Sequence, residues 1–162
     1  MTSWRTGQGI DAHAFCTGRP LVLGGVRIPY EKGLAGHSDA DVLVHAIMDA
    51  LLGAAAMGDI GRLFPPTDNA YKDISSLDLL EKVSHLLTIN GWMVVNVDAT
   101  IIAENPRVSP FKKEMENNIQ KRIAGKPVIN VKATTTEGLG FTGRGEGVAS
   151  LAVALISRNK ED

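Results

Sequence analysis

Two hydrophobic periods alternate along this chain of 162 residues, and together they require a fold that combines helices with a sheet. Apolar residues recur at helical spacing after Ser38, and again from about Ser75 to Asn90. Residues 92–104 alternate instead between apolar and polar side chains, with Val95 on the apolar face, which indicates a half-buried strand. Helices and strands therefore both contribute to the core.

The remaining elements complete an order of strands, two helices, a strand, a helix and strands. A third helix is predicted to follow Ser109 and to stop at Gly125. Gly24 and Gly25 are predicted to form the two-residue turn of a hairpin. Further strands are predicted at residues 9–13, 21–23, 26–28, 128–136 and 148–156, the last of them buried. This order predicts an α+β fold in which residues 1–162 form a single domain, with a mixed sheet and the helices packed on one face.

The charge balance and the cysteine content restrict the class of protein. Seventeen basic and eighteen acidic residues give a formal charge of −1, which argues against a general binder of nucleic acid. The one cysteine, Cys16, cannot form an internal disulfide and favours a reducing compartment. The longest run without a charged or strongly polar residue, 50–58, is half of the ~20 residues that a membrane span needs. We therefore expect a cytoplasmic protein with neither nucleic acid nor a membrane as its partner.

Glycine is frequent in this chain and aromatic residues are rare. There are 17 glycines, whereas aromatic residues make up 5%. Small aliphatic side chains must therefore fill the core, and many backbone positions must turn or approach another group closely. This composition favours a ligand site.

Two separate segments carry residues that can hold a metal ion. Asp11 and His13 are two positions apart, so on a strand both side chains leave the same face. His45 lies among apolar neighbours, where an unpaired polar group is costly. One carboxylate and two imidazoles with an open fourth position match a catalytic zinc site, and Cys16 is interpreted as a small buried or half-buried thiol rather than a ligand. The alternative is a surface carboxylate near unrelated histidines, one of them satisfied in the core.

The helix that carries His45 has two acidic residues at matching spacing. Asp41, His45 and Asp49 are four residues apart and form one stripe on a helix. Ser38, three residues before Asp41, resembles the start of a capping box and predicts that the helix begins at Ser38. The two acids either form ordinary surface pairs or, in the case of Asp49, orient His45.

Hydroxyl groups, a carboxylate and glycines follow one another near the C-terminus. Thr134, Thr135 and Thr136 precede Glu137, and the glycine-rich residues 138–147 come next. This combination suits a phosphate group held together with a divalent cation. Threonines are also ordinary strand residues, and the segment matches neither a Walker sequence nor G-x-G-x-x-G.

Six motifs occur along the chain in the order Asp11-Ala12-His13, Gly24-Gly25-Val26-Arg27-Ile28-Pro29, His37-Ser38-Asp39-Ala40-Asp41, Asp59-Ile60-Gly61, Lys132-Ala133-Thr134-Thr135-Thr136-Glu137 and Gly140-Phe141-Thr142-Gly143-Arg144-Gly145-Glu146-Gly147. In this combination they resemble the 2-C-methyl-D-erythritol 2,4-cyclodiphosphate synthases, a family of the non-mevalonate isoprenoid pathway. The resemblance extends from about Gly7 to Ile156.

The resemblance implies an activity, an assembly and two kinds of cation. It implies a phosphorus–oxygen lyase that converts 4-diphosphocytidyl-2-C-methyl-D-erythritol 2-phosphate to 2-C-methyl-D-erythritol 2,4-cyclodiphosphate and releases CMP, by metal-assisted intramolecular phosphoryl transfer. It implies a homotrimer with active sites between neighbouring subunits. It also implies that Asp11, His13 and His45 hold one Zn²⁺ per subunit. Glu137 would help to hold Mg²⁺ or Mn²⁺ between the α and β phosphates.

The resemblance also assigns roles to individual positions. It implies catalytic roles for His37 and Thr135, the latter in transition-state stabilisation. Arg144 and Glu146 match residues that line a cavity on the trimer axis, where an isoprenoid diphosphate is proposed to bind. The positions implied to contact the substrate are Asp11, His13, His37, Ser38, Asp59, Ile60, Gly61, Phe64, Pro65, Pro66, Thr67, Asp68, Ala103, Glu104, Asn105, Pro106, Arg107, Val108, Ser109, Thr134, Thr135, Thr136, Glu137, Phe141 and Arg144.

Two positions depart from the usual pattern of that family. Pro66 stands where many members carry Asp, which affects a contact to a sugar hydroxyl. Arg107 stands where many carry Lys, which keeps the charge but changes the donor geometry.

Two other functions fit parts of the sequence. A metal-dependent phosphoesterase would use the same ligands to activate water, and product analysis separates it from the cyclase. A non-enzymatic trimeric binding protein is disfavoured by three clustered metal ligands.

Overall fold

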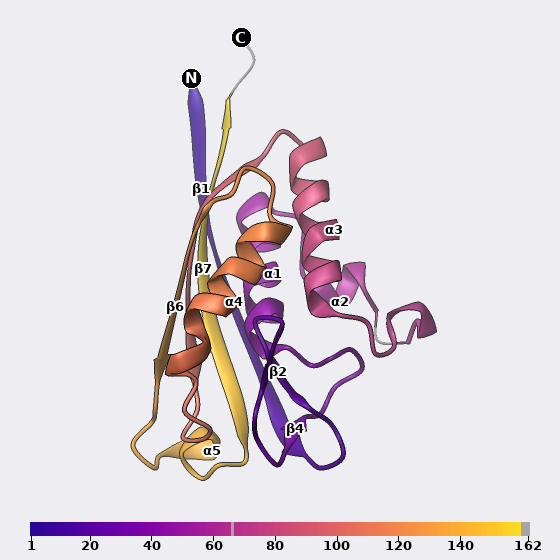
Figure 1. The fold of residues 1–162 in the computed structure, drawn as a ribbon. Helices are drawn as coiled ribbons and strands as arrows, with labels where there is room; N and C mark the ends of the chain where they lie inside the picture. Colours follow the sequence, from indigo (N-terminus) through magenta and orange to yellow (C-terminus); the bar gives the residue numbers. More distant parts are fainter. Residues whose placement is uncertain (66, 160–162) are drawn as a thin grey trace.

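A five-stranded mixed sheet with helices against one face forms the body of the computed structural model, which describes residues 1–65 and 67–159 (Figure 1). The strand order is β4 (Gly33–Leu34), β1 (Thr2–Cys16), β7 (Gly147–Asn159), β5 (Met93–Ile102) and β6 (Val128–Thr134). Strands β5 and β6 are parallel, and the other neighbouring pairs are antiparallel. The predicted α+β class and mixed sheet are confirmed.

Three long helices cover the sheet, and shorter turns connect them. The predicted hairpin is confirmed as β2 (Leu21–Leu23) and β3 (Val26–Ile28). Both of its turn glycines have positive φ, as a tight two-residue turn requires. The helical elements are α1 (Val42–Ala55), α2 (Ile60–Leu63), α3 (Ser76–Ile89), α4 (Lys112–Arg122), α5 (Gly140–Gly143) and the 3₁₀ turns η1 (Asn69–Tyr71) and η2 (Ser109–Phe111). Among the described residues, none of these helices has the length and apolar character that crossing a membrane requires.

Helix α1 lies directly on strands β1 and β7 and forms the centre of the core (Figure 1). Two glycines of β1 make this close approach possible. A Cβ atom on Gly9 would lie 1.9 Å from the carbonyl oxygen of Ala46, and one on Gly7 would lie 2.0 Å from that of Ala50. The strand and the helix therefore meet backbone to backbone, on the face of β1 that also carries Asp11 and His13.

The predicted start of α1 at Ser38 is wrong. The helix begins at Val42, and Asp41 is its N-cap, with a side-chain oxygen that accepts a hydrogen bond from the backbone N–H of Val44. The same buried carboxylate accepts hydrogen bonds from the backbone N–H groups of Gly24 and Gly25, at 3.0 and 2.7 Å. Asp41 is thus a structural link between hairpin and helix and not part of a surface pair.

Four strand predictions also require correction. Strand β1 has 15 residues rather than the short segment expected around residues 9–13, because it pairs with β7 over most of its length. In β5, a register shift between Val94 and Asn96 buries Val94 and leaves Val95 half-buried. Strand β7 is buried on its helix-covered face only, since Val153 on the opposite face is 50% exposed. Strand β6 ends at Thr134, two residues before the predicted end.

We predict that Gly9→Ala lowers the stability of the fold. The added methyl group has no space against the Ala46 carbonyl, so α1 must move away from the sheet. The expected loss is about 1–3 kcal/mol in the free energy of unfolding, measured by urea denaturation. Gly53→Ala, on α1 itself, is the control, because its Cβ would meet only the Gln8 oxygen at 3.8 Å. A helical glycine replaced by alanine in open space is neutral or stabilising by up to about 1 kcal/mol. Equal stability of the two variants would contradict the packing argument.

Candidate functional site

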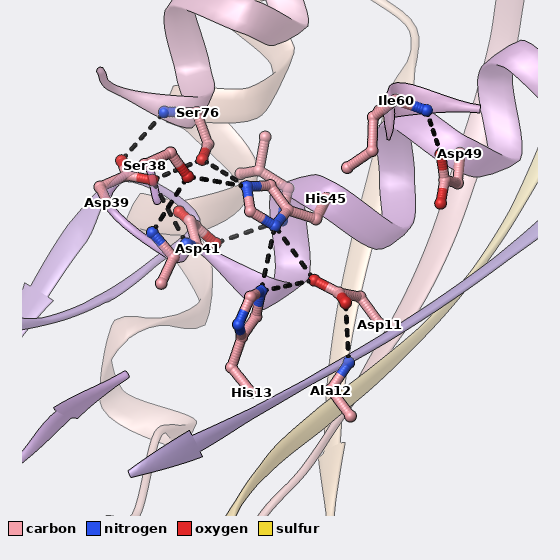
Figure 2. A network of polar contacts seen from close by, with 12 residues as sticks. Asp11, Ala12, His13, Ser38, Asp39, Asp41, His45, Asp49, Ile60 and Ser76 are labelled. Atoms are coloured by element: carbon pink, nitrogen blue, oxygen red, sulfur yellow. Dashed lines mark hydrogen bonds and ion pairs between the residues drawn. The ribbon is translucent and has the colours of Figure 1, made fainter. Parts of the chain in front are cut away.

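Three potential metal ligands converge where β1 meets α1 (Figure 2). Asp11 and His13 extend from the same face of β1, and His45 extends towards them from the first turn of α1. The Asp11 Oδ2 atom lies 2.9 Å from His13 Nε2 and 3.0 Å from His45 Nδ1, and the two nitrogens are 3.3 Å apart. The sequence prediction that these three side chains meet is confirmed in its geometry.

The second ring nitrogen of His13 is fixed by the backbone. Its Nδ1 atom lies 2.7 Å from the carbonyl oxygen of Ala35, and a carbonyl oxygen can only accept a hydrogen bond. Nδ1 therefore carries the proton, and in the neutral ring the lone pair of Nε2 faces Asp11. This is the usual arrangement of a metal-binding histidine, whose other nitrogen donates to a carbonyl or carboxylate group.

The electrostatics of the cluster couple Asp11 to the two imidazoles. Burial opposes ionisation of Asp11, but hydrogen bonds and charge from His13 and His45 outweigh it and hold the pKa of this carboxyl well below its usual range. In return, the hydrogen bond to Asp11 raises the pKa of His13, against the effect of burial. His13 thus retains a proton that a cation would displace on binding.

The donor set fits a small divalent cation such as zinc. Two ligands of a tetrahedral zinc ion lie about 3.3 Å apart, given bonds of about 2.0–2.1 Å. The three separations of 2.9–3.3 Å match this value, and the side chains are mostly buried, at 11–25% exposed. A carboxylate oxygen and two imidazole nitrogens are also the ligand types of catalytic zinc sites.

Serine hydroxyls, rather than Asp49, contact the far side of the His45 ring. Its Nε2 atom lies 2.9 Å from the hydroxyl of Ser76 and 3.2 Å from that of Ser38. Asp49 instead accepts a hydrogen bond from the backbone N–H of Ile60 at 2.8 Å (Figure 2). The hypothesis that Asp49 orients His45 by hydrogen bonding is therefore wrong, and its contact holds the start of α2.

A cleft of about 200 Å³ opens beside the metal ligands. It brings together several positions from the predicted substrate-binding set, which come from the loops before α1 and around α2. His37 at this cleft lies with Nε2 3.2 Å from the carbonyl oxygen of Asp68. The residues that line this first cleft are His13, His37, Ser38, His45, Ile60, Gly61, Phe64, Tyr71 and Leu79.

Two of these lining residues, and two polar residues behind the ligands, were missed by sequence reasoning. Tyr71 packs edge-on against Phe64, with ring centroids 5.3 Å apart. The sequence could have indicated Tyr71, because an aromatic residue in the long loop at 59–73 is notable in a chain with 5% aromatic residues. Ser76 and Asp39 carried no such signal, since their contact joins segments 37 residues apart. Pro66, predicted at this cleft, lies outside the described residues.

A second cleft, of about 500 Å³, gathers the predicted cytidine and cation positions at the end of β6. The Thr135 hydroxyl donates a hydrogen bond to the carboxylate of Glu137 at 2.9 Å. One carboxylate oxygen of Glu104 accepts from the backbone N–H groups of Thr136 and Gly138, each at 3.1 Å, and so fastens this loop. The residues that line the second cleft are Ala103, Glu104, Pro106, Arg107, Val108, Ser109, Ala133, Thr134, Thr135 and Glu137.

The two clefts lie on different strands of the sheet. The register pairs Asp11 with Ser150, Ser150 with Ile101, and Ile101 with Ala133. Three strand spacings separate Asp11 from Ala133, which corresponds to about 14 Å. Among the residues that the structure describes, the two clefts share no lining residue. One chain therefore holds the predicted site residues in two separate groups.

Three further predicted positions lie on α5, at its C-cap, or at the N-cap of α2. Arg144 forms an exposed two-point ion pair with Glu146, and this contact raises the pKa of the guanidinium and lowers that of the carboxyl. Phe141 is 42% exposed on α5. Asp59 caps α2 through the backbone N–H of Arg62, at 3.0 Å.

We predict that metal binding at the Asp11–His13–His45 cluster releases protons and weakens at low pH. Because Asp11 raises the pKa of His13, this ring holds a proton at a higher pH than an ordinary imidazole, and a cation must displace it. Affinity for Zn²⁺ should fall by about tenfold per pH unit once the pH drops below that pKa. Calorimetry in buffers of different ionisation enthalpy measures the released proton. The exposed His85 supplies the control, since His85→Ala should leave the profile unchanged. Binding without proton release at every pH would contradict the prediction.

Comparison with known proteins agrees with this geometry. The model of the YgbB family matches residues 4–157. The 2-C-methyl-D-erythritol 2,4-cyclodiphosphate synthase of Clostridium novyi (strain NT) is 56% identical over 154 residues, which cover 94% of this chain and 98% of that protein. The enzyme of the same name from Pelotomaculum thermopropionicum is 57% identical over 159 residues, covering 95% and 96%.

Solved structures give the same result at lower sequence identity. IspF of Plasmodium falciparum, in a CDP complex, superposes with a TM-score of 0.84 at 31% identity, and 98% of each chain is covered. The bifunctional IspDF from Campylobacter jejuni superposes with a TM-score of 0.93 at 42% identity, over 99% of this chain and 44% of that longer chain. The family match, the relatives of full length and the shared fold lead to one conclusion: this chain belongs to the YgbB family of 2-C-methyl-D-erythritol 2,4-cyclodiphosphate synthases.

Proposed function

We propose that this chain converts 4-diphosphocytidyl-2-C-methyl-D-erythritol 2-phosphate to 2-C-methyl-D-erythritol 2,4-cyclodiphosphate and CMP, as a cytoplasmic phosphorus–oxygen lyase. The observation that carries the proposal is the convergence of Asp11, His13 and His45 beside a cleft. In the reaction, an oxygen of the 2-phosphate forms a bond to the β-phosphorus. The bond from the β-phosphorus to the bridging oxygen breaks, and CMP leaves with that oxygen.

The chemistry requires positioning more than proton abstraction. A phosphate monoester is already anionic, so the chain needs to align it with the β-phosphorus and balance the charge along the diphosphate. A zinc ion held by Asp11, His13 and His45 supplies Lewis acidity and a template at this place. His37 and Ser38 line the same cleft and are the residues we assign to the phosphate end of the substrate.

The second cleft suits the nucleotide end of the substrate. We assign the cytidine to residues 103–109 and the second cation, Mg²⁺ or Mn²⁺, to Glu137. The exposed Glu137 carboxylate and the neighbouring threonine hydroxyls offer oxygen ligands and donors, as hard cations and phosphates require. The CDP bound to IspF of Plasmodium falciparum supports a cytidine nucleotide as the ligand class.

A homotrimer would join the two groups of residues into one site. Within one chain they lie about 14 Å apart, so a neighbouring copy can bring the second cleft of one subunit to the first cleft of another. The uncovered sheet face supports such an assembly, because Ile10 and Val153 there are 65% and 50% exposed. The pair Arg144 and Glu146 is the place we propose for an isoprenoid diphosphate on the trimer axis.

The reaction predicts a product that distinguishes this enzyme from a phosphoesterase. With the cytidyl substrate, Zn²⁺ and Mg²⁺, phosphorus NMR should show a cyclic diphosphate and CMP in equal amounts. His45→Ala removes one of three ligands and should abolish both turnover and zinc binding, which elemental analysis measures. The exposed His85→Ala should retain both. Release of inorganic phosphate instead of the cyclic product would refute the proposal.

We assign Thr135 to stabilisation of the transition state. Its hydroxyl donates to Glu137, so the donor already points to the carboxylate that we assign to the second cation. Thr135→Ala should lower kcat with little change in KM, by an amount equivalent to about 2–4 kcal/mol if it resembles other oxyanion donors. Thr135→Ser keeps the hydroxyl and should retain most of the activity. A near-normal kcat in the alanine variant, with zinc intact, would leave Thr135 an ordinary strand-end residue.

A further inference from the structure

A chain of polar contacts extends from His45 away from the metal ligands (Figure 2). The His45 Nε2 atom lies 2.9 Å from the hydroxyl of Ser76, which in turn donates to Oδ1 of Asp39. We propose that Ser76 and Asp39 are positioning residues, which fix the proton of His45 on Nε2 and so direct the lone pair of Nδ1 at the metal ion. The inference rests on the proposed metal centre and assigns two residues that act through its helical ligand.

Asp39 takes both hydrogen-bond donors of Ser76. Its Oδ2 atom accepts from the backbone N–H of Ser76 at 3.0 Å, and its Oδ1 atom accepts from the Ser76 hydroxyl. The backbone N–H of Asp41 also donates to Oδ1, at 3.2 Å. Since a carboxylate only accepts, the two-point contact fixes the direction in which the Ser76 proton points.

Counting protons then determines which tautomer of His45 is favoured. A serine hydroxyl has one proton, and Ser76 gives it to Asp39. The oxygen of Ser76 can therefore only accept from His45, which favours the tautomer with hydrogen on Nε2. The opposite tautomer would place a lone pair of Nε2 against lone pairs of Ser76, and its Nδ1–H group would donate to Asp11 and have to lose its proton before a cation could bind there.

Burial makes this preference strong. Ser76 is 0% exposed and His45 is 9% exposed, so water cannot supply a replacement hydrogen bond. The hydroxyl oxygen of Ser38 accepts from the backbone N–H of Ala40 and lies 3.2 Å from Nε2, where its remaining lone pair can accept a second hydrogen bond. The arrangement parallels that of His13, whose Nδ1 proton is held by the Ala35 carbonyl. Each imidazole ligand thus has its non-ligating nitrogen fixed by a buried oxygen.

The hydroxyl contact of Ser76 is separate from the bond by which Asp39 accepts from the first backbone N–H of helix α3, and Ser76→Ala removes only the hydroxyl. Ser76 is the first residue of α3, and the N-cap position belongs to Ser75. Ser84 offers a matched control on the same helix, since it is also buried and its hydroxyl accepts from the backbone N–H of Ala124 at 2.9 Å. Ser84→Ala removes a comparable hydrogen bond about two turns further along the helix from Ser76.

The test measures zinc affinity and the His45 tautomer of the full-length protein. Zn²⁺ is titrated into metal-free wild type, Ser76→Ala and Ser84→Ala. Nitrogen-15 NMR of labelled histidine, at a pH about two units above the usual imidazole value, reports which nitrogen carries the proton. We expect Ser76→Ala to bind zinc 10–100-fold more weakly. Its His45 should show both tautomers, whereas wild type and Ser84→Ala show the Nε2–H form.

The outcomes separate this inference from the proposed function. Wild-type zinc affinity and an unchanged tautomer in Ser76→Ala would overturn the positioning role while leaving the metal centre intact. A wild type that binds no zinc would refute the metal centre, and this inference with it. Asp39→Asn is the second variant if Ser76→Ala does not fold. Its amide can donate to Ser76 and so release the serine proton towards His45, which should also weaken zinc binding by about tenfold. Wild-type affinity in that variant would again contradict the proposal.

Discussion

The close contact between β1 and α1 is the constraint on which the rest of the structure depends. Gly7 and Gly9 allow the carbonyl groups of the helix to approach the strand to distances at which a Cβ atom could not fit. Side chains of the same strand face, two and four positions after Gly9, are Asp11 and His13. The glycines therefore set how near His45 comes to its two partners. A wider helix–sheet spacing would leave the same residues in the sequence without a common ligand position.

The cluster is held together by an ionised carboxylate that lies within hydrogen-bond distance of two imidazoles. The Nδ1–H group of His13 donates a hydrogen bond to a backbone carbonyl, and the pKa of Asp11 lies well below its usual range. Three potential ligand atoms lie within 3.3 Å of one another, and the proton that Asp11 stabilises on His13 supplies positive charge that a bound cation would replace. The fold thus brings three potential ligands for a cation together in a preformed arrangement.

The sequence predicts the ligands better than their surroundings. The two-residue strand period places Asp11 beside His13, and the apolar neighbours of His45 indicate a buried imidazole, so the three ligands follow from local patterns. The start of α1 could not be predicted from the sequence, because Ser38 and Asp41 both suit an N-cap. Only the hydrogen bonds from the backbone N–H groups of the hairpin to Asp41 decide between them.

Other features depend on contacts between distant segments. The bulge in β5 is set by its pairing with β7, and so the buried face of Val94 could not be read from the alternation. Asp39 and Ser76 meet through loops whose sequences contain no shared period. The separation of Glu137 from the metal ligands also needed the strand order, which places β7 and β5 between β1 and β6.

That strand order determines the distance between the two clefts of one chain. The distance between the two clefts is counted in hydrogen-bonded strands, whose spacing is set by the backbone and is nearly independent of side chains. Substitutions of side chains on the open face can therefore change the contacts that this face makes without changing the distance between the two clefts of one chain. Only a change in strand order or a new bulge alters this interval within one chain, so the interval depends on the backbone and hardly at all on the side chains.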